Sequence, residues 1–226
     1  MTESNSPDSE FRKAWHGYYS EKRIVHQWLQ VALLQDIPIR KVLEIGPYLG
    51  LVTAMMASAG YAVTTLDIEA QSHGIGLENH IQADIRNVDP GSIQGFDAIL
   101  CCETLEHIHW QKLDSVLQRI ATAGAPWLIL SVPYEGFQFA FELYFNRQRW
   151  RRRNHFRKFR FLRRFSIQSE TEWEAHKWEI GYRGHSLKTF ERKIEAAGFH
   201  IIRREFTSGC RSVFFICRND AAAVDS

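Results

Sequence analysis

The sequence has no long apolar run and little cysteine. No stretch of about 18 or more uncharged apolar residues occurs among its 226 residues, which argues against a membrane-spanning helix. The first residues, MTESNSPDSE, are polar and acidic instead of basic and then apolar, so we do not expect a secretory signal peptide. The four cysteines form no C-x-x-C pair and stand in apolar, strand-like runs, which is typical of reduced, buried thiols. We therefore expect a cytoplasmic protein without a disulfide framework.

Length and composition favour one decorated domain. With 45% hydrophobic residues, the chain can bury one sizeable core. We expect that domain at 11–218, between a disordered tip at 1–10 and a frayed tail at 219–226. Its first part, 11–36, has apolar residues at spacings of three and four, which predicts amphipathic helix with Gly17 as the point of division.

Short apolar runs alternate with helical patterns through the middle of the chain. Such alternation, with unbroken apolar strands, predicts an α/β fold whose parallel sheet is covered on both faces. A helix between Ser186 and Gly198 follows, and then two runs that look like an antiparallel strand pair. The expected parallel strands are KVLEI, AVTTLD, HIQAD, FDAILCC and PWLILSVP.

The turn after the first of these strands, in KVLEIGPYLG, lies where an open parallel sheet usually binds a nucleotide-like ligand. A dinucleotide fingerprint needs glycine at three fixed positions, but Tyr48 and Leu51 occupy two of them. A phosphate-binding P-loop is excluded as well, because no Gly-Lys-Ser/Thr follows. What remains is Glu44, two residues before Gly46, and a second glycine, Gly50.

This turn resembles the first motif of the class I S-adenosylmethionine (SAM)-dependent methyltransferases. Glu44, Gly46 and Gly50 are in place, and Tyr48 stands where the family usually has its middle glycine. The resemblance covers about residues 40 to 218, and its specificity comes from several motifs in the right order. It implies a Rossmann-like, seven-stranded, mostly parallel sheet flanked by helices, with SAM as cofactor and S-adenosylhomocysteine as product.

Later motifs supply the rest of the implied cofactor site. In TTLDIE, Asp67 matches the acid that hydrogen-bonds the ribose hydroxyls in this family, with Ile68 beside it. In QADIRN, Asp84 and the backbone N–H of Ile85 match the segment that faces the adenine. Cys102 matches the position whose backbone lines the methionine end of the cofactor. Together with the first motif, these residues form the predicted cofactor-binding set.

The segment ETLEH directly follows the fourth expected strand, where the transferred methyl group should lie. Glu103, Glu106 and His107 could chelate Mg²⁺ or a similar divalent ion through carboxylate oxygens and an imidazole nitrogen. Alternatively, His107 takes a proton from the acceptor as a catalytic base, with Glu106 beside it. A third interpretation is structural, with the glutamate near a helix start and the histidine packed on the sheet.

This E-x-x-E-H arrangement resembles two metal-assisted branches of the family. They are the ubiquinone-biosynthesis O-methyltransferases and the small-RNA 2′-O-methyltransferases, which act on the 3′-terminal ribose. In the second branch another histidine comes from a segment resembling DHKFEW, and this chain has AHKWEI with His176 at that place. The resemblance implies a four-ligand metal site of Glu103, Glu106, His107 and His176.

An insert at 137–175, after the fifth expected strand, is basic and aromatic. Between Arg147 and Arg164 it has ten lysine or arginine residues and no acid, although the net charge of the chain is only +2. Phe137 and Phe141 stand at helical spacing, so we expect a basic amphipathic helix. It could be a lid that packs on the acidic body, a dock for an anionic membrane surface, or a surface for single-stranded RNA.

The residues thus support two classes of function. The first is a SAM-dependent methyltransferase that forms an O-methyl product on a small or lipid-associated acceptor, peripheral at a membrane surface if the insert docks there. An RNA ribose 2′-O-methyltransferase with a divalent metal is the alternative enzyme. The second class is a non-catalytic binding module of the same fold, in which the Tyr48 ring obstructs the cofactor.

Overall fold

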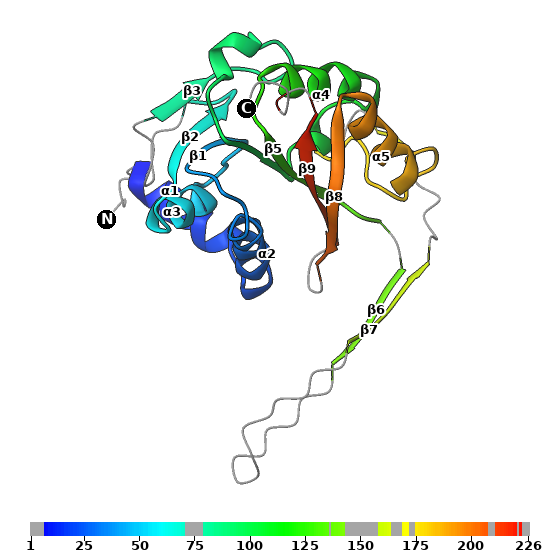
Figure 1. The fold of residues 1–226 in the computed structure, drawn as a ribbon. Coiled ribbons are helices and arrows are strands. Elements are labelled where there is room, and N and C mark those ends of the chain that lie inside the picture. The colour runs from blue at the N-terminus through cyan, green and yellow to red at the C-terminus, as the bar shows by residue number, and fades with distance from the viewer. Residues whose placement is uncertain are drawn as a thin grey trace, which may run out of the picture.

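The structure, a computed structural model, is built around a seven-stranded sheet with helices on both faces (Figure 1). It describes residues 7–70, 79–135, 137–142, 158–163, 169–171, 175–207, 211–220 and 222. The strand order is β3-β2-β1-β4-β5-β9-β8. These strands are β1 (Lys41–Ile45), β2 (Ala62–Asp67), β3 (His80–Gln82), β4 (Ala98–Cys102), β5 (Trp127–Pro133), β8 (Phe199–Phe206) and β9 (Ser212–Asn219).

Strand pairing gives the sheet its mixed character. β1 pairs in parallel with β2 and β4, and the parallel set extends to β3 and β5. β9 lies antiparallel to both β5 and β8, so β9 alone of the seven opposes the common direction. The predicted seven-stranded, mostly parallel sheet with an antiparallel C-terminal pair is confirmed. Because parallel strands end at one edge, the segments after β1, β2 and β4 meet there.

The helices follow the capping residues of the sequence. Ser20 caps α2 by accepting a hydrogen bond from the Arg23 backbone N–H, and Ser186 caps α5 by accepting from that of Thr189. The predicted division at Gly17 is displaced, because α1 continues through it and the break comes just before α2. The helices are α1 (Pro7–Tyr18), α2 (Glu21–Ala32), α3 (Leu51–Ser58), α4 (Leu113–Thr122) and α5 (Leu187–Ala196).

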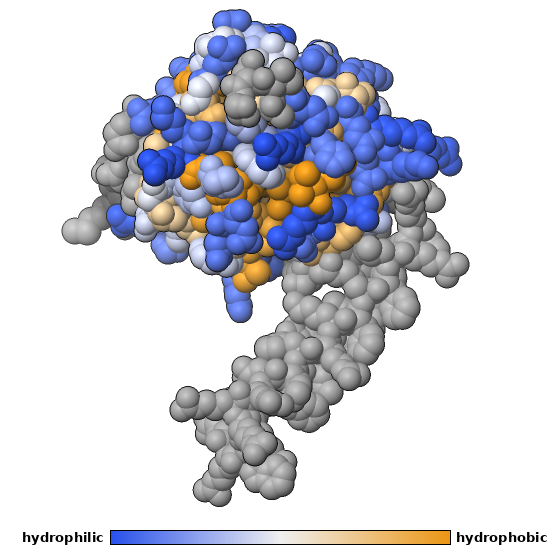
Figure 2. Space-filling model, viewed as in Figure 1, coloured by the Kyte–Doolittle hydropathy of each residue, from blue (hydrophilic) through white to orange (hydrophobic). Residues whose placement is uncertain are grey.

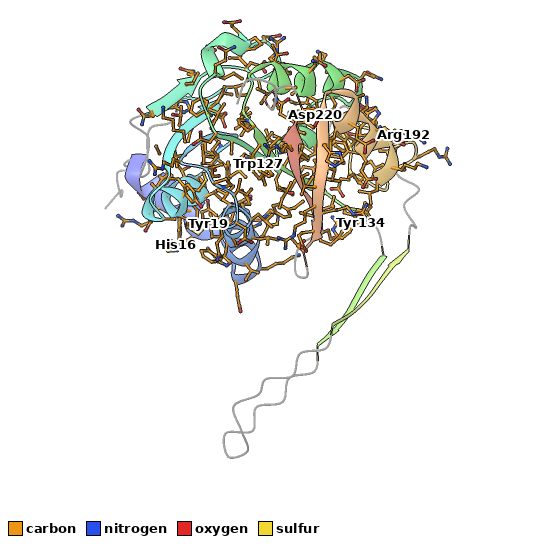
Figure 3. All side chains as sticks on the ribbon, viewed as in Figure 1. His16, Tyr19, Trp127, Tyr134, Arg192 and Asp220 are labelled. Carbon is orange, nitrogen blue, oxygen red and sulfur yellow. The ribbon has the colours of Figure 1, made fainter. Side chains whose placement is uncertain are left out.

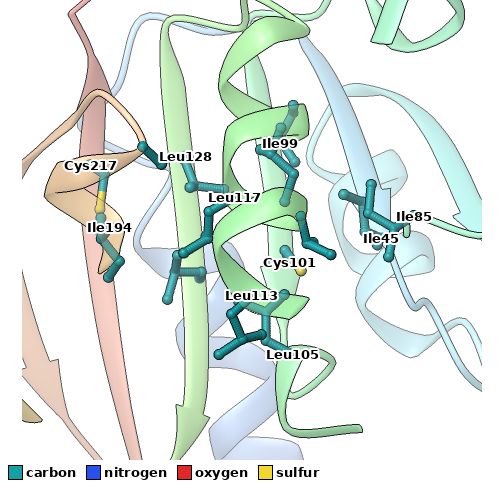
Figure 4. Close-up of a cluster of buried hydrophobic side chains, with 14 of the residues drawn as sticks. Ile45, Ile85, Ile99, Cys101, Leu105, Leu113, Leu117, Leu128, Ile194 and Cys217 are labelled. Atoms are coloured by element: carbon teal, nitrogen blue, oxygen red, sulfur yellow. The ribbon is translucent and has the colours of Figure 1, made fainter. Parts of the chain in front are cut away.

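Two apolar layers hold the helices to the sheet. Leu43 and Ile45 belong to the layer beneath α4 and α5, part of which Figure 4 shows, whereas Val42 belongs to the layer beneath α2 and α3. This alternation follows from the two-residue period of a strand. Burying one leucine or isoleucine side chain contributes about 1.5–3 kcal/mol to the free energy of unfolding. The two layers therefore hold helices against both faces of the sheet.

Three cysteines lie inside these layers. Cys101, Cys102 and Cys217 are free and buried, and Cys210 lies outside the described residues. Burial raises the pKa of each of the three thiols above its usual range. They are therefore protonated at neutral pH and act as small apolar side chains.

The segment between β4 and α4 is irregular, and no regular helix begins before Leu113 in it. The short 3₁₀ turns η3 (Leu105–His107) and η4 (Trp110–Lys112) precede α4, and another, η2 (Pro90–Ile93), lies before β4. Turn η3 contains two of the candidate ligands, Glu106 and His107. The predicted tip at 1–10 overlaps α1, which begins at Pro7, and most of the predicted tail lies outside the described residues.

The prediction of a helical insert is wrong for the parts of the insert that the structure describes, because these parts are strands. Strands β6 (Phe137–Glu142) and β7 (Lys158–Arg163) form a separate antiparallel pair away from the main sheet (Figure 1). Their register sets Phe139 opposite Phe161 and Phe141 opposite Phe159. Aromatic residues at every second position of FQFAFE favour a strand, and this period competes with the helical spacing of Phe137 and Phe141 on which the helix prediction rested. Residues 143–157 and 164–168 lie outside the described part.

The two ends of the insert are joined at its base. The Glu135 backbone N–H donates to the Ile180 carbonyl at 2.7 Å, and the Ile180 N–H donates to the Pro133 carbonyl at 3.1 Å. Gly181 lies against the Glu135 carbonyl so closely that a Cβ there would be 1.8 Å from its oxygen. The chain thus leaves β5 and returns to it at almost the same point.

The surface gives one further fact about membranes. Within the described ranges, no helix is long and apolar enough to cross a bilayer. On the face shown in Figure 2, apolar residues reach the surface near the middle and hydrophilic residues surround them.

Candidate active site

The turn after β1 is shaped by residues with a left-handed backbone. Gly46 and Gly50 have φ of 76° and 75°, and Tyr48 between them has φ of 51°. Only glycine adopts this region without strain, so Tyr48 is held there by its surroundings. A Cβ on Gly46 would lie 2.4 Å from the Thr104 Oγ1, whereas one on Gly50 would meet nothing within 4 Å. Gly46 is therefore needed for close approach as well as for conformation.

Thr104 ties this turn to the end of β4. Its hydroxyl lies 3.2 Å from the Ile45 carbonyl oxygen and 3.1 Å from that of Cys102, and it can donate to either. The Cys102 backbone, predicted to line the methionine end of the cofactor, is thus fixed relative to the glycine turn. Thr104 belongs to the ETLEH segment that the sequence singled out, but its bridging role requires the fold to be seen.

Glu44 is buried behind the turn. Its side chain is 4% exposed, and the Thr53 hydroxyl of α3 donates to Oε2 at 2.6 Å. Burial raises the Glu44 pKa to about 7, although the Thr53 hydrogen bond opposes that shift. In this structure Glu44 anchors the start of α3.

Tyr48 turns its ring outward. It is 59% exposed, and its ring packs on Tyr18 at 4.6 Å between centroids. Arg23 lies over the Tyr18 ring at 4.1 Å, a cation–π contact. Burial raises the pKa of Tyr19, which is labelled in Figure 3, to about 12, although the nearby Leu51 backbone at the start of α3 opposes that shift. These tyrosines cover the glycine turn from the α1–α2 junction, and the sequence alone gave no sign of this because they fit an ordinary amphipathic helix.

The other predicted cofactor residues lie at the same edge of the sheet. Asp67 ends β2, and its Oδ1 accepts from the Glu69 backbone N–H at 3.1 Å, while Ile68 is 59% exposed. The Asp84 carboxylate is paired with Arg86, whose guanidinium lowers the Asp84 pKa. Ile85 places its side chain in the core. Its backbone is therefore the part of this residue that can face a ligand.

Three of the four predicted metal ligands come together. Glu106 and His107, from turn η3, and His176 each offer one ligand atom, and these atoms lie within 4.8 Å of one another. The two imidazole rings meet edge to face, with 5.2 Å between centroids. His176 comes from far along the sequence, and the Lys177 N–H fixes its segment by donating to the Glu106 carbonyl at 2.8 Å.

Hydrogen bonds at both Nδ1 atoms define the tautomers of these histidines. His107 Nδ1 lies 2.8 Å from the Ala175 carbonyl oxygen, and His176 Nδ1 lies 2.9 Å from Glu179 Oε1. A carbonyl and a carboxylate only accept, so both Nδ1 atoms carry the proton and donate. Burial lowers the His107 pKa, which favours the neutral ring with its lone pair on Nε2. Such an arrangement is typical of metal-binding histidines.

Glu106 is the unusual member of the cluster. It is fully buried, and neither carboxylate oxygen has a hydrogen-bond partner in the described structure. Burial raises its pKa well above the usual range, and the negative charges of Glu103 and Glu179 add to the shift. A buried acid without a partner is costly unless a bound cation compensates it. The donor set of one carboxylate and two imidazoles therefore fits a divalent metal.

Glu103 is not part of this cluster. Its backbone has φ of 51°, and the Ser131 hydroxyl donates to its Oε1 at 2.7 Å. The buried His26 of α2 lies on the same oxygen at 3.7 Å. The structure thus brings Glu106, His107 and His176 together and leaves the predicted fourth ligand nearby, engaged with other partners.

Comparisons with known proteins agree with this architecture. A family model described as a methyltransferase domain matches residues 15–202. No curated protein sequence matches the chain.

Three solved structures illustrate the likeness in fold. The 1,6-didemethyltoxoflavin-N1-methyltransferase of Burkholderia thailandensis, with bound 1,6-didemethyltoxoflavin and S-adenosylhomocysteine, is 17% identical, with a TM-score of 0.56 over 93% of this chain and 82% of that one. The magnesium protoporphyrin IX methyltransferase of Synechocystis PCC 6803, with bound SAM, is 15% identical, with a TM-score of 0.57 over 95% and 92%. The methyltransferase domain of bacterial CtHen1 is 14% identical, with a TM-score of 0.57 over 87% and 99%.

The family match covers most of the chain, and the sheet order, the glycine turn and the acids near the ends of β1 and β2 agree with it. The prediction of a SAM-dependent methyltransferase is therefore confirmed, and this chain belongs to the methyltransferase domain family.

Proposed function

We propose that this methyltransferase transfers the methyl group of SAM to a hydroxyl of a small or lipid-associated acceptor, with a divalent cation held by Glu106, His107 and His176. The observation that carries the proposal is the buried, unpartnered Glu106 carboxylate beside two imidazoles whose Nδ1 atoms are engaged. A carboxylate in this state needs a positive partner.

SAM would bind across the carboxyl ends of β1, β2 and β4. Two of the neighbouring structures contain SAM or S-adenosylhomocysteine, which supports the same cofactor here. Asp67 would hydrogen-bond the ribose, Asp84 and the Ile85 N–H would face the adenine, and the Cys102 backbone would line the methionine end. The outward ring of Tyr48 argues against the obstructed binding module.

The protein chiefly has to align the reacting atoms, because a sulfonium donor carries its own leaving group. When bound, the divalent cation would lower the pKa of an acceptor hydroxyl and so supply the nucleophile. Glu106, His107 and His176 would position that hydroxyl beside the turn that Thr104 links to the cofactor segment. In this proposal His107 and Glu106 act as ligands, and the alternative of His107 as a metal-free base remains for experiment.

A second candidate acceptor is the 2′-hydroxyl of an RNA ribose. It is favoured by the position of His176, because the AHKWEI segment, which resembles the small-RNA enzymes, brings its histidine to His107. A ribose with adjacent hydroxyls can chelate a metal with two oxygens. A short RNA with a free 3′-terminal diol, compared with the same RNA ending in 2′-deoxyribose, tests this candidate.

The experiment is methyl transfer from labelled SAM to a panel of phenols, lipid-linked phenols in vesicles and short RNAs, after chelation and again after adding Mg²⁺, Mn²⁺ or Co²⁺. We expect activity to be lost with chelator and restored by metal. Activity that survives both chelation and His176→Ala unchanged would remove the metal and favour His107 as base. Calorimetry with S-adenosylhomocysteine is the control for the cofactor site, and Asp67→Ala should abolish that binding with the fold retained.

The insert offers a way to identify the acceptor class. Its ten basic residues between Arg147 and Arg164 suit an anionic surface, either lipid headgroups or RNA phosphates. Flotation with anionic vesicles at physiological salt supports a lipid-associated acceptor, and retention of single-stranded RNA supports the second candidate. If neither is retained, the insert is a lid over a small-molecule site.

A further inference from the structure

His176 and Glu179 form a contact in which the histidine is partly exposed and the glutamate is buried. The imidazole is 39% exposed, whereas the glutamate side chain is 7% exposed, and Nδ1 and Oε1 are 2.9 Å apart. Of the proposed ligands, His176 is the one that comes from a separate segment instead of the turn after β4. Its ring therefore needs a support of its own.

The backbone on each side of Glu179 is firmly fixed. Trp178 is fully buried, and its indole N–H donates to the Ile108 carbonyl at 2.9 Å. Ile180 is also fully buried and bridges to Tyr134 at the end of β5. Glu179 thus stands between two anchored residues, and the position of its carboxylate is set by the core.

A charged side chain lies near the second carboxylate oxygen of Glu179, which has no hydrogen-bond partner among the described residues. Arg211 Nη1 lies 3.9 Å from Glu179 Oε2 and also pairs with Glu135. The Tyr134 N–H donates to the Arg211 carbonyl at 2.6 Å, which fixes the arginine backbone at the end of β5. Arg211 therefore lies on the side of Glu179 that faces away from the His176 contact, although its own exposure weakens the pair.

We propose that Glu179, supported by Arg211, is a positioning residue that holds His176 as the Nδ1–H tautomer with Nε2 directed at Glu106 and His107. The inference rests on the proposed metal role of His176 and adds the group that prepares it. A carboxylate behind a ligating histidine fixes the ring and raises its basicity, and losing it typically costs about 10–100-fold in metal affinity.

The test compares two glutamates that share one arginine. Glu179 and Glu135 both pair with Arg211, but only Glu179 also contacts His176. Binding of Mn²⁺ to the full chain, measured by calorimetry and by electron paramagnetic resonance, should weaken about 10–100-fold in Glu179→Ala. Glu179→Gln should recover part of the loss, because its amide oxygen still accepts from Nδ1–H. Glu135→Gln should stay within about twofold of wild type.

Two further measurements separate positioning from a loss of fold. Affinity for S-adenosylhomocysteine and the melting temperature should change little in Glu179→Gln. Nitrogen NMR of the histidines in metal-free protein should show His176 as the Nδ1–H tautomer in wild type and a mixture of tautomers in Glu179→Ala.

The outcomes distinguish this inference from the proposed function. If wild type binds Mn²⁺, His176→Ala does not, and Glu179→Ala binds as wild type does, the positioning role is overturned and the metal site stands. If wild type binds no divalent ion, the proposed metal chemistry fails, and the tautomer measurement still decides the role of Glu179. An unchanged tautomer in Glu179→Ala would overturn it in either case.

Discussion

The turns after β1 and β4 lie at the same edge of the sheet, and each contains a non-glycine residue with φ of 51°, Tyr48 in one and Glu103 in the other. Each also has a buried glutamate close by. Glu44, near the first turn, accepts a hydrogen bond from Thr53. Glu106, in the second, has no partner for either oxygen among the described residues.

The two turns differ in how their buried glutamates are compensated. The glutamate near the first turn has a hydrogen-bond partner inside the protein, and the glutamate in the second has none among the described residues. Glu44 accepts a hydrogen bond from Thr53 inside the protein, so part of the cost of its burial is compensated without a ligand. Glu106 is costly to bury as it stands, and such cost persists where it serves a function. Changes to the second turn should therefore affect chemistry, and changes to the first should affect stability.

The largest effect is expected for Glu106→Gln, which keeps the shape and removes the charge. Metal binding and methyl transfer should fall by about 100-fold or more, since a charged ligand is lost. The metal-free variant should melt at a higher temperature than wild type at neutral pH, because a buried unpaired carboxylate is gone. Calorimetry with Mn²⁺ and thermal unfolding check both results. A variant that loses stability and keeps its metal would contradict the comparison.

Glu44→Gln tests how the buried glutamate near the first turn makes stability depend on pH. In the folded state the Glu44 pKa is raised to about 7 from a usual 4.5, so the folded protein binds more protons between these values. Stability should therefore fall as pH rises from about 4.5 to 7 and level off above, by up to about 3 kcal/mol. The variant should lack this slope in denaturant titrations across pH.

Thr53→Val is the matched partner for that measurement. It removes the hydrogen bond that opposes the upward shift of the Glu44 pKa, so the slope should extend above pH 7. An unaltered pH profile in both variants would mean that Glu44 titrates normally.

Gly46 and Gly50 in the first turn separate the effect of a steric clash from the effect of backbone strain. Both have positive φ, so each alanine substitution should cost about 1 kcal/mol from backbone strain. Gly46→Ala should cost roughly a further 1–2 kcal/mol because its Cβ meets Thr104, while Gly50→Ala meets nothing. Denaturant unfolding measures both. Equal losses would show that the Thr104 side chain moves aside freely.

The smallest effect is expected for Tyr48→Gly, which restores the usual family residue. Because the ring is 59% exposed and packs on Tyr18, affinity for S-adenosylhomocysteine should change by no more than about threefold. A gain of tenfold or more in calorimetry would mean that the ring does obstruct the cofactor.

Much of this comparison could be predicted from the sequence. The order of Glu44, Gly46, Asp67 and Asp84 indicated the cofactor edge, since parallel strands bring their carboxyl ends together. The AHKWEI segment identified His176 as a partner for the histidine after β4. What spacing cannot give is side-chain direction after an irregular turn.

Glu103 shows that limit. A regular helical turn would have set it beside His107, but its left-handed backbone sends the carboxylate to Ser131. Supporting contacts were equally hidden. Thr104 reaches Ile45 and Tyr18 reaches Tyr48 across long separations in sequence, and the contact of Glu179 with His176 depends on how their segment folds. The insert was mistaken because FQFAFE supports both periods, and only strand pairing decides between them.

The joined base of the insert has a consequence for engineering. Because Glu135 and Ile180 are hydrogen-bonded to each other, the intervening chain begins and ends at one point of the frame. Closing a shorter or longer loop between fixed ends changes the free energy of unfolding only slowly with length. Chimeras that exchange the segment beyond Glu135, and retain the return from Ala175, would thus test whether this segment selects the acceptor, because the sheet and its turns are left unchanged.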